Sequence, residues 1–295
     1  MMKVIITGSL GNISKPLTQE LIKKGHKVTV VSSKSEKQKD IEMLGATVAI
    51  GSLEDVDFLA STFSKADAVY CMVPPNFAET DQTAYYIKLG RNYAKAIQQS
   101  GVNRVIGLSS YGAHLDKGTG FIVGSYNVEK ILNNLSDVNI THIRPAYFYY
   151  NLYNFINMIK ATGFIGANYG GEDKLAMVSP TDIADVIAEE IVKPVTGRKV
   201  LYVASDDHTC NEIAGVLGKA IGMNDLKWIT LTNEQMKNGL EANGVPAHIA
   251  DNLIEMGAAT HSGALREEYD KDKPVMGKIK LNDFAKEFAA AFLKG

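Results

Sequence analysis

The sequence predicts an α/β protein, a doubly wound parallel sheet with a smaller, mainly helical C-terminal lobe. Short apolar runs rich in β-branched residues alternate with amphipathic segments throughout the first half, which is typical of a sheet covered by helices on both faces. The first run, residues 4–6, leads directly into a turn that contains Gly8 and Gly11. The alternation loosens after Pro145, and helical segments dominate from Ser205 onward.

Composition narrows the classes of function. Of 295 residues, 45% are apolar and 22% charged, and the net charge of −2 gives no indication of nucleic-acid or membrane binding. Cys71 and Cys210 are the only cysteines, so we expect neither a disulfide framework nor a metal site. No apolar stretch reaches about 18 residues. We therefore expect a cytoplasmic protein without a metal or a transmembrane helix.

Six strands are expected in the first half, in regular alternation with helices. The expected strands are 3–7, 27–31, 47–50, 68–72, 104–109 and 140–144. The expected helices are 15–24, 35–44, 53–63, 80–100 and 124–135. Gly25, Gly45 and Gly101 follow helices, where a left-handed C-cap favours glycine. Strands and helices at this spacing predict parallel order, with ligand contacts just after each strand.

We expect residues 1–150 to form the sheet domain, with a strand, helix and strand at about 174–204 returning to it. Residues 151–173 and 205–295 would form the smaller lobe. That lobe includes part of an aromatic segment (147–159) and a glycine-rich loop (163–171). Its expected later elements are an edge strand at 227–231 and helices over 210–221, 233–242, 247–259 and 282–293.

The turn after the first strand has the chemistry of a dinucleotide site, as in a Rossmann fold. Gly8 and Gly11 allow backbone N–H groups to approach a ligand closely, and the helix that follows directs its positive end at the turn. Together these features hold a pyrophosphate. The spacing is Gly-x-x-Gly-x-x-Ser, so Ser14 stands in place of a third glycine.

The residues after the second strand favour NADP(H) over NAD(H). Folds that bind NAD place an acidic residue there to hold the ribose hydroxyls. This chain has Ser32, Ser33 and Lys34 instead, and hydroxyls with a lysine suit a 2′-phosphate, which a carboxylate would repel. The alternative is a solvated start to a lysine-rich helix.

Two further strand ends are candidate contacts. Pro74 follows the fourth strand, where it either lies near a ribose or simply ends the strand. Ser109 and Ser110 follow the fifth strand, and their hydroxyls are expected to contact the nicotinamide side or a substrate carbonyl. The alternative is an ordinary polar strand end.

Tyr126 and Lys130 are the candidate catalytic pair. Residues four apart share a helix face, and a lysine can lower the pKa of a tyrosine so that the phenol serves as an acid in carbonyl reduction. The alternative is that Tyr126 faces the cofactor from the helix and Lys130 is solvated.

The chain resembles the NmrA-like group of atypical short-chain dehydrogenase/reductases, particularly bacterial quinone oxidoreductases and triphenylmethane or azo-dye reductases. The resemblance rests on the turn from Thr7 to Gly11, the missing acid after the second strand, Ser-Ser-Tyr at 109–111, Ile-Arg-Pro at 143–145, Thr-Asp-Ile-Ala at 181–184 and Gly-Ala-Leu at 263–265.

This resemblance implies an NADPH-binding core and a pocket roofed by the C-terminal lobe. At the pyrophosphate it places Gly8, Ser9, Gly11, Asn12 and Ile13. At the 2′-phosphate it places Ser32, Ser33 and Lys34, with Pro74 near the ribose. At the nicotinamide end it places Ser109, Ser110, Pro145 and Tyr147.

Two functions remain open. The first is hydride transfer from NADPH to a quinone-like or other conjugated small molecule, which the aromatic run 147–155 favours, although core packing explains half or more of those rings. The alternative is a non-catalytic NADP(H) sensor that binds a protein partner. No nucleic-acid or membrane partner is expected, and a homodimer is left open.

Overall fold

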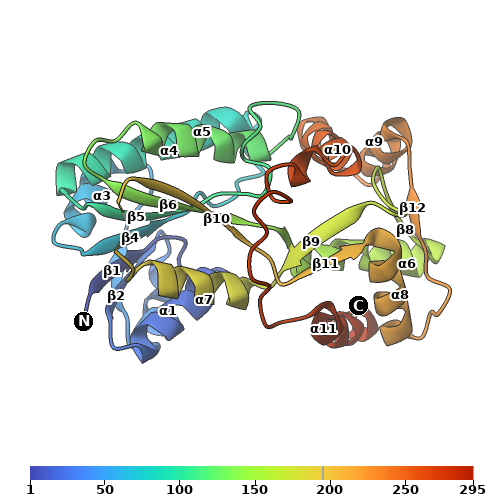
Figure 1. Ribbon diagram of the computed structural model, residues 1–295, viewed down its shortest axis with the longest axis horizontal. Helices are drawn as coiled ribbons and strands as arrows, with labels where there is room; N and C mark the ends of the chain where they lie inside the picture. The colour runs from blue at the N-terminus through green and yellow to red at the C-terminus, as the bar shows by residue number, and fades with distance from the viewer. Residues whose placement is uncertain (195, 295) are drawn as a thin grey trace. The chain divides into compact units, whose positions relative to one another are not determined.

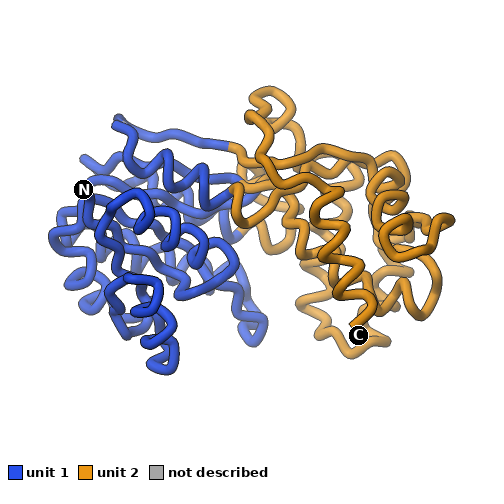
Figure 2. The backbone as a smooth tube through the Cα atoms, turned by 90° about the horizontal axis from the view of Figure 1, so that it is seen from below, with its two compact units in different colours: residues 1–110, 124–144, 183–201 blue, residues 111–123, 145–182, 202–295 orange. Residues whose placement is uncertain are grey.

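The computed structural model describes residues 1–194 and 196–294, which fall into two compact units (Figure 2). The first comprises residues 1–110, 124–144 and 183–201, and the second comprises residues 111–123, 145–182 and 202–295. Each unit is assembled from three separate stretches of chain. The units are therefore described one at a time.

The first unit is built around a seven-stranded parallel sheet in the order β10-β6-β5-β4-β1-β2-β3. Its strands are β1 (Lys3–Ile6), β2 (Lys27–Ser32), β3 (Thr47–Ile50), β4 (Ala68–Cys71), β5 (Arg104–Leu108), β6 (Asn139–Pro145) and β10 (Arg198–Val203). Strand β1 lies in the middle, where Val4 is in register with Val28 of β2 and with Ala68 of β4. The predicted doubly wound sheet is confirmed.

Helices cover both faces of this sheet. They are α1 (Ser14–Lys23), α2 (Gln38–Met43), α3 (Val56–Phe63), α4 (Gln82–Ser100), α5 (Ile122–Asn133) and α7 (Pro180–Glu190). Figure 1 shows α3, α4 and α5 over one face, and α1 and α7 over the other. Asp55 and Asp81 cap α3 and α4 by accepting backbone N–H bonds at 2.9 and 2.8 Å, which satisfies donors that helix starts leave open.

The core of the first unit explains why its strands read as continuous apolar runs. Val4, Ile6 and Val30 are fully buried, because helices leave neither face of the sheet to water. On one face, Leu59 and Phe63 of α3 pack with Ile97 of α4 and with the strands. Each such side chain contributes about 1.5–3 kcal/mol through burial.

The second unit contains two small sheets and most of the later helices. The sheets are β11-β9-β7 and β12-β8, formed by β7 (Tyr147–Phe148), β8 (Ile165–Ala167), β9 (Lys174–Val178), β11 (Asp206–Thr209) and β12 (Trp228–Thr230). Its α-helices are α6 (Ile156–Thr162), α8 (Cys210–Ile221), α9 (Asn233–Ala242), α10 (Ala247–His261) and α11 (Leu281–Lys294). Three-residue to seven-residue 3₁₀ segments occur at η1 (Ser35–Lys37), η2 (Tyr149–Phe155) and η3 (Ala264–Arg266).

Two details differ from the expected organisation. Strand β9, which was expected to return to the large sheet, instead pairs with β11 and β7. The expected glycine-rich loop at 163–171 contains strand β8, which pairs in parallel with the expected edge strand β12. A strand's partner depends on where distant segments lie, and its own sequence does not specify them.

Most of the aromatic run forms the core of the second unit. Tyr149 stacks on Phe284 of α11 with ring centroids 5.3 Å apart. Tyr153 stacks in the same way on Phe288, and Phe155 meets Trp228 edge to face at 5.2 Å. None of the described helices is long and apolar enough to cross a membrane.

Candidate functional site

The turn between β1 and α1 depends on glycine at position 8. Gly8 has φ +89°, a left-handed conformation, and a Cβ there would lie 2.8 Å from Ser14 Oγ and 2.9 Å from Met72. Ser14, which replaces the usual third glycine, donates its hydroxyl to the Thr7 carbonyl at 2.9 Å. The serine therefore fastens the helix to the strand end.

Ser9 is the second unusual position of the turn. Its φ is +53°, which costs free energy for a residue other than glycine. Its N–H bonds to the Val31 carbonyl of β2 at 3.0 Å, and its hydroxyl donates to Ser32 Oγ at 3.0 Å. These bonds join the turn to the end of β2, so the predicted pyrophosphate and 2′-phosphate residues lie together.

The end of the turn presents backbone donors. Gly11 N–H bonds to the Gly8 carbonyl, and Lys15 N–H to the Gly11 carbonyl. Among the described residues, the N–H groups of Asn12 and Ile13 have no hydrogen-bond acceptor. They lie at the positive N-terminal end of α1, an arrangement that favours an anion.

Thr7 fixes the neighbouring strand end, and the sequence analysis did not select it as a site residue. Its hydroxyl donates to the Tyr70 carbonyl at 3.1 Å and accepts from Met72 N–H at 3.0 Å. The buried Tyr93 hydroxyl donates to the Met72 carbonyl at 2.6 Å. These bonds hold together the ends of β1 and β4, between which the strand order reverses, and ligands of doubly wound sheets bind at such a reversal.

The end of β2 separates one buried serine from two exposed residues. Ser32 is 2% exposed and accepts the Lys34 N–H at 3.2 Å. Ser33 and Lys34 are exposed. Lys34 has no ion-pair partner among the described residues, whereas Lys37 pairs with Asp40 at 3.6 Å. The exposed cation is thus available to a phosphate.

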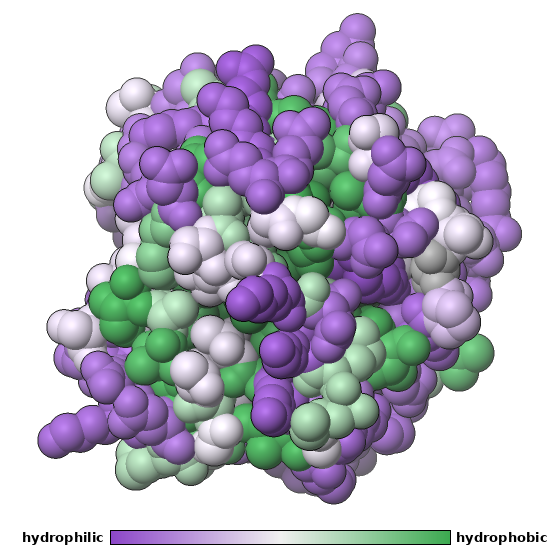
Figure 3. All heavy atoms as spheres, turned by 90° about the vertical axis from the view of Figure 1, so that its left-hand side faces the viewer, coloured by the Kyte–Doolittle hydropathy of each residue, from purple (hydrophilic) through white to green (hydrophobic). Residues whose placement is uncertain are grey.

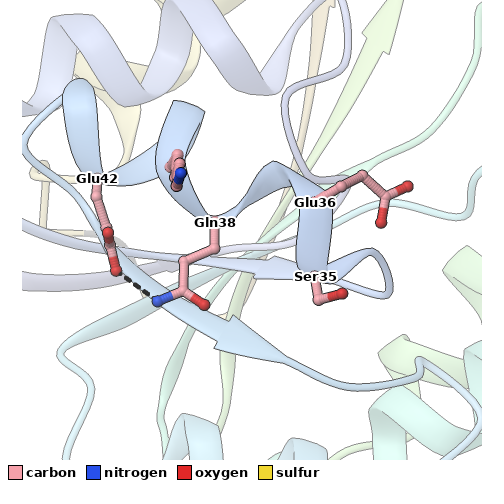
Figure 4. Close-up of a pocket in the computed structure, with 5 residues that line it drawn as sticks. Ser35, Glu36, Gln38 and Glu42 are labelled. Carbon is pink, nitrogen blue, oxygen red and sulfur yellow. Dashed lines mark hydrogen bonds between the residues drawn. The ribbon is translucent and has the colours of Figure 1, made fainter.

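A surface hollow lies beside this segment, along η1 and α2 (Figure 4). Ser35, Glu36, Gln38, Lys39 and Glu42 line it. Gln38 donates to Glu42 at 2.8 Å, and Glu36 points away from that pair. Because two carboxylates line the hollow, its electrostatics oppose phosphate binding, and Lys34 remains the better candidate.

Ser109, at the end of β5, has a different partner from the expected one. Its hydroxyl donates to Glu129 Oε1 at 2.5 Å, and Arg144 contacts both Glu129 oxygens at 2.9 and 2.7 Å. Glu129 and Arg144 are 5% and 9% exposed. A buried arginine requires such a partner, and Arg144 within an apolar strand is the one feature of the sequence that could have indicated this cluster.

The remaining candidates of the first unit are partly exposed. The Pro74 carbonyl accepts the Tyr85 hydroxyl at 3.2 Å, and Ser110 is half-buried at the end of β5. On α5, Lys130 is exposed, and its ammonium lies 5.9 Å from the centroid of the half-buried Tyr126 ring. Water solvates an exposed ammonium and screens its charge.

Pro145 and Tyr147 belong to the second unit. The Pro145 carbonyl accepts the Tyr111 N–H at 3.1 Å. Tyr147 packs against the aromatic core and bonds to the Tyr169 hydroxyl. Burial raises the pKa of Tyr147 to about 12, so this phenol stays protonated at neutral pH.

A buried charge cluster fastens the segment after α10 within the second unit. Arg266 is 9% exposed and forms two bonds of 2.9 Å to Asp207 and two further bonds, of 3.2 and 2.9 Å, to Asp270. The Arg266 guanidinium and the Lys273 ammonium lie over the Tyr269 ring, at 5.5 and 5.8 Å from its centroid. Sequence reasoning could not find this cluster, because Asp207 is 59 residues from Arg266 and no local pattern connects them.

In residues 1–194 and 196–294, no group of three or more His, Cys, Asp or Glu side chains could hold a metal ion. On the face of the molecule drawn in Figure 3, hydrophilic residues lie between the hydrophobic ones.

Comparisons with known proteins agree with the arrangement of the first unit. The chain is 24% identical over 301 residues to the NAD(P)H azoreductase of Xenophilus azovorans, covering 98% of this chain and 99% of the relative. It is similar in fold to the Escherichia coli NADPH-dependent quinone oxidoreductase QOR2 complexed with NADPH (TM-score 0.83, 20% identity, 96% and 99% of the two chains). The Citrobacter triphenylmethane reductase complexed with NADP(H) is similar too (TM-score 0.81, 19% identity, 97% and 99% coverage).

The family assignment rests on a match over almost the whole chain. The sequence profile described as the NmrA-like family matches residues 1–276, a range that includes the glycine turn, the serines after β5 and the Arg266 cluster. The resemblance found in the sequence is confirmed, and the chain belongs to the NmrA-like family.

Proposed function

We propose that this protein is an NADPH-dependent oxidoreductase that transfers hydride to a quinone-like or other conjugated small molecule. The observation that carries the proposal is the joined pair of strand ends in the first unit. There, unpaired N–H groups of Asn12 and Ile13 lie on the same framework as the exposed Ser33 and Lys34.

The residues present fit a dinucleotide phosphate. Gly8 cannot carry a side chain without displacing Ser14 or Met72, so the backbone of the turn stays close to the helix start. Asn12 and Ile13 would donate to the pyrophosphate, and Ser33 and Lys34 would bind the 2′-phosphate. When bound, the cofactor supplies a hydride.

The protein's part in such a reaction is to bind, orient and exclude water. Pro74, Ser110, Pro145 and Tyr147 are proposed to contact the ribose and nicotinamide, as the family resemblance implies. The Ser109 hydroxyl is committed to Glu129, so we propose that Ser109 positions the strand end through that bond.

The activities for which the relatives are named support the acceptor class. An azoreductase, a quinone oxidoreductase and a triphenylmethane reductase act on conjugated molecules that accept electrons readily. Such acceptors require little acid assistance, which suits a helix on which Lys130 is exposed. Tyr126 remains a predicted proton donor, and a Tyr126→Phe variant that retains full kcat would remove it from that role.

The test is a binding titration followed by an acceptor panel. We expect the purified protein to bind NADPH at least about tenfold more tightly than NADH. It should then oxidise NADPH in the presence of a naphthoquinone or an azo dye. Absence of turnover with every quinone, dye and aldehyde tried would overturn the enzymatic proposal.

The alternative function is an NADP(H) sensor that binds a protein partner. The observation that favours it is the exposure of Lys130, which leaves the predicted proton donor Tyr126 without a buried ammonium beside it. A sensor would bind the cofactor tightly, change conformation on binding and show no turnover. Steady NADPH oxidation with any acceptor would exclude it.

A further inference from the structure

The Ser32 hydroxyl, at the end of β2, is hydrogen-bonded to two separate segments of the first unit. It accepts the Ser9 hydroxyl at 3.0 Å and the Lys34 N–H at 3.2 Å, and it donates to the Lys34 carbonyl at 3.3 Å. A serine hydroxyl has one donor hydrogen and two acceptor lone pairs. All three are engaged here, so the buried Ser32 hydroxyl has no donor left for a phosphate oxygen.

Both donors of Ser9 are also engaged within the protein. Its hydroxyl donates to Ser32, and its N–H donates to the Val31 carbonyl at 3.0 Å. Ser9 has φ +53°, a conformation that glycine adopts without steric cost. For the backbone alone, serine is therefore the less favourable residue at this position. What serine adds is the hydroxyl, and the acceptor of that hydroxyl is Ser32.

The Ser32 hydroxyl thus connects the two segments that bind the cofactor in the proposed function. On one side lies the turn that leads to Asn12 and Ile13, whose N–H groups are proposed to bind the pyrophosphate. On the other side lies the backbone of Lys34, which is extended (φ −114°, ψ 112°) and precedes η1. A serine side chain that accepts the N–H two residues on forms a local turn. This turn sets the position from which the Lys34 side chain begins.

We propose that Ser32 is a positioning residue for cofactor selection, which holds the Lys34 backbone against the glycine turn without itself touching the 2′-phosphate. The inference rests on the proposed binding of NADPH, and it replaces the expected direct contact of Ser32 with the phosphate. The pyrophosphate and the 2′-phosphate belong to one molecule. A framework that fixes their binding groups relative to each other before binding reduces the entropy lost when the cofactor binds.

The experiment is a double-mutant cycle on cofactor affinity, with Ser32→Ala, Lys34→Ala and the combined variant. Titration calorimetry gives the dissociation constants for NADPH and NADH. Ser32→Ala should weaken NADPH binding about fivefold, as expected when one side chain must be immobilised on binding, and leave NADH binding within about twofold. In the Lys34→Ala background the same substitution should change NADPH binding by less than about twofold, because no lysine remains to be positioned.

The opposite outcome of the cycle is equally definite. If Ser32→Ala weakens NADPH binding by the full factor in both backgrounds, Ser32 binds the phosphate directly and the positioning role is overturned. Amide hydrogen exchange in the cofactor-free protein provides a second readout. The Lys34 N–H should exchange about threefold faster in Ser32→Ala than in the wild type, since it loses its acceptor. Unchanged exchange would contradict the proposal.

Ser100 provides a matched control for the loss of a serine turn. It is half-buried at the end of α4, and its hydroxyl likewise accepts the N–H two residues on, that of Val102 at 3.5 Å. Ser100→Ala should leave the affinity for both cofactors within about twofold. If it weakens NADPH binding as much as Ser32→Ala does, the effect at Ser32 reflects general loss of stability and the proposal fails.

Ser9→Gly is a second variant that spares the fold, because glycine adopts the left-handed conformation freely. It removes the hydroxyl that donates to Ser32. NADPH binding should weaken about twofold to threefold in the wild-type background and remain unchanged in the Ser32→Ala background. An equal loss in both backgrounds would show that Ser9 acts independently of Ser32.

Failure of this inference can be distinguished from failure of the proposed function, because binding is measured without turnover. If the wild type prefers NADPH and Ser32→Ala retains the whole preference, the positioning role is wrong and the cofactor assignment stands. If the wild type binds NADPH no more tightly than NADH, the cofactor assignment itself fails, and the positioning role fails with it.

Discussion

In the seven-stranded sheet, polar groups are paired differently at the N-terminal ends of the strands (the amino edge) and at their C-terminal ends (the carboxyl edge). At the amino edge, Arg104 bonds to the Glu190 carbonyl at 2.8 Å and to Thr141 at 3.0 Å. Glu190 is 1% exposed and also contacts Lys199 with both oxygens at 3.2 Å. At the carboxyl edge, the turn leaves the N–H groups of Asn12 and Ile13 unpaired among the described residues.

This difference teaches how one sheet serves stability and binding separately. Buried charges that pair with each other stabilise the fold, and removing one of them leaves the other buried without a partner. Donors left open at a helix start are available to a ligand. Substitutions at the amino edge should therefore change the free energy of unfolding, and those at the carboxyl edge should change cofactor affinity.

The largest effect is expected at the amino edge, from Glu190→Gln. Removing the carboxylate takes away the negative charge that lies 3.6 Å from the buried Arg104 guanidinium and 3.2 Å from Lys199, while the bond from Arg104 to the Glu190 backbone carbonyl remains. The loss of this charge should lower the free energy of unfolding by about 3 kcal/mol. The dissociation constant for NADPH should stay within about twofold. Urea unfolding and a binding titration measure the two quantities.

Glu189 is the matched control, since it is exposed in the preceding position of α7. Glu189→Gln should change stability by no more than about 0.5 kcal/mol. Equal effects at 189 and 190 would contradict a stabilising role for the buried cluster.

Gly8→Ala should combine a stability cost with a loss of affinity. The left-handed backbone costs a residue with a Cβ about 1–2 kcal/mol, and the contacts with Ser14 and Met72 force the turn to move. We expect NADPH to bind at least about tenfold more weakly. Gly25→Ala provides the comparison, because Gly25 has φ +81° but open space around it, so only stability should fall.

Lys34→Ala should weaken NADPH binding about tenfold and leave NADH binding within about twofold. The reason is that only NADPH carries the 2′-phosphate. Lys37→Ala tests whether another nearby lysine can bind the 2′-phosphate equally well, since the Lys37 ammonium already pairs with Asp40. Equal losses for both cofactors would rule out the assignment of the 2′-phosphate to Lys34.

The smallest effect concerns His142, which lies within β6 between the two edges. Burial lowers the pKa of His142 below its ordinary value of 6.5. The unfolded chain then binds the proton more tightly, so the stabilisation is complete above about pH 6.5 and is lost as pH falls through the lowered pKa. One proton limits the slope to about 1.4 kcal/mol per pH unit, and unfolding curves of wild type and His142→Gln between pH 8 and 5 should diverge accordingly.

The sequence predicted the large sheet well because its strands are buried on both faces and its helices end at glycines. It did not predict β7 or β11. Strand β7 has two residues, and β11 (Asp-Asp-His-Thr) has no apolar residue, so neither has hydrophobic periodicity. Both are strands because β9 supplies hydrogen-bond partners from elsewhere in the chain.

The residues of the candidate site also differ in whether the sequence alone could predict their arrangement. The glycine turn and the serines after β2 are contiguous motifs with a known local chemistry, so sequence alone could place them together. The partner of Ser109 could not be found in this way, because Glu129 resembles any polar residue on an amphipathic helix until β6 brings Arg144 beside it. Long-range pairs of this kind follow from topology.

The interleaving of the two compact units along the chain has a consequence for how the protein can be divided. Three stretches of each unit alternate, so the polypeptide passes between them five times. A fragment ending at residue 201 would contain all of the first unit. It would also carry Tyr149, Leu152 and Phe155 without Phe284 and Phe288, which cover them in the whole chain. No single cut separates the two units from each other, and we expect proteolytic fragments to aggregate through these uncovered rings.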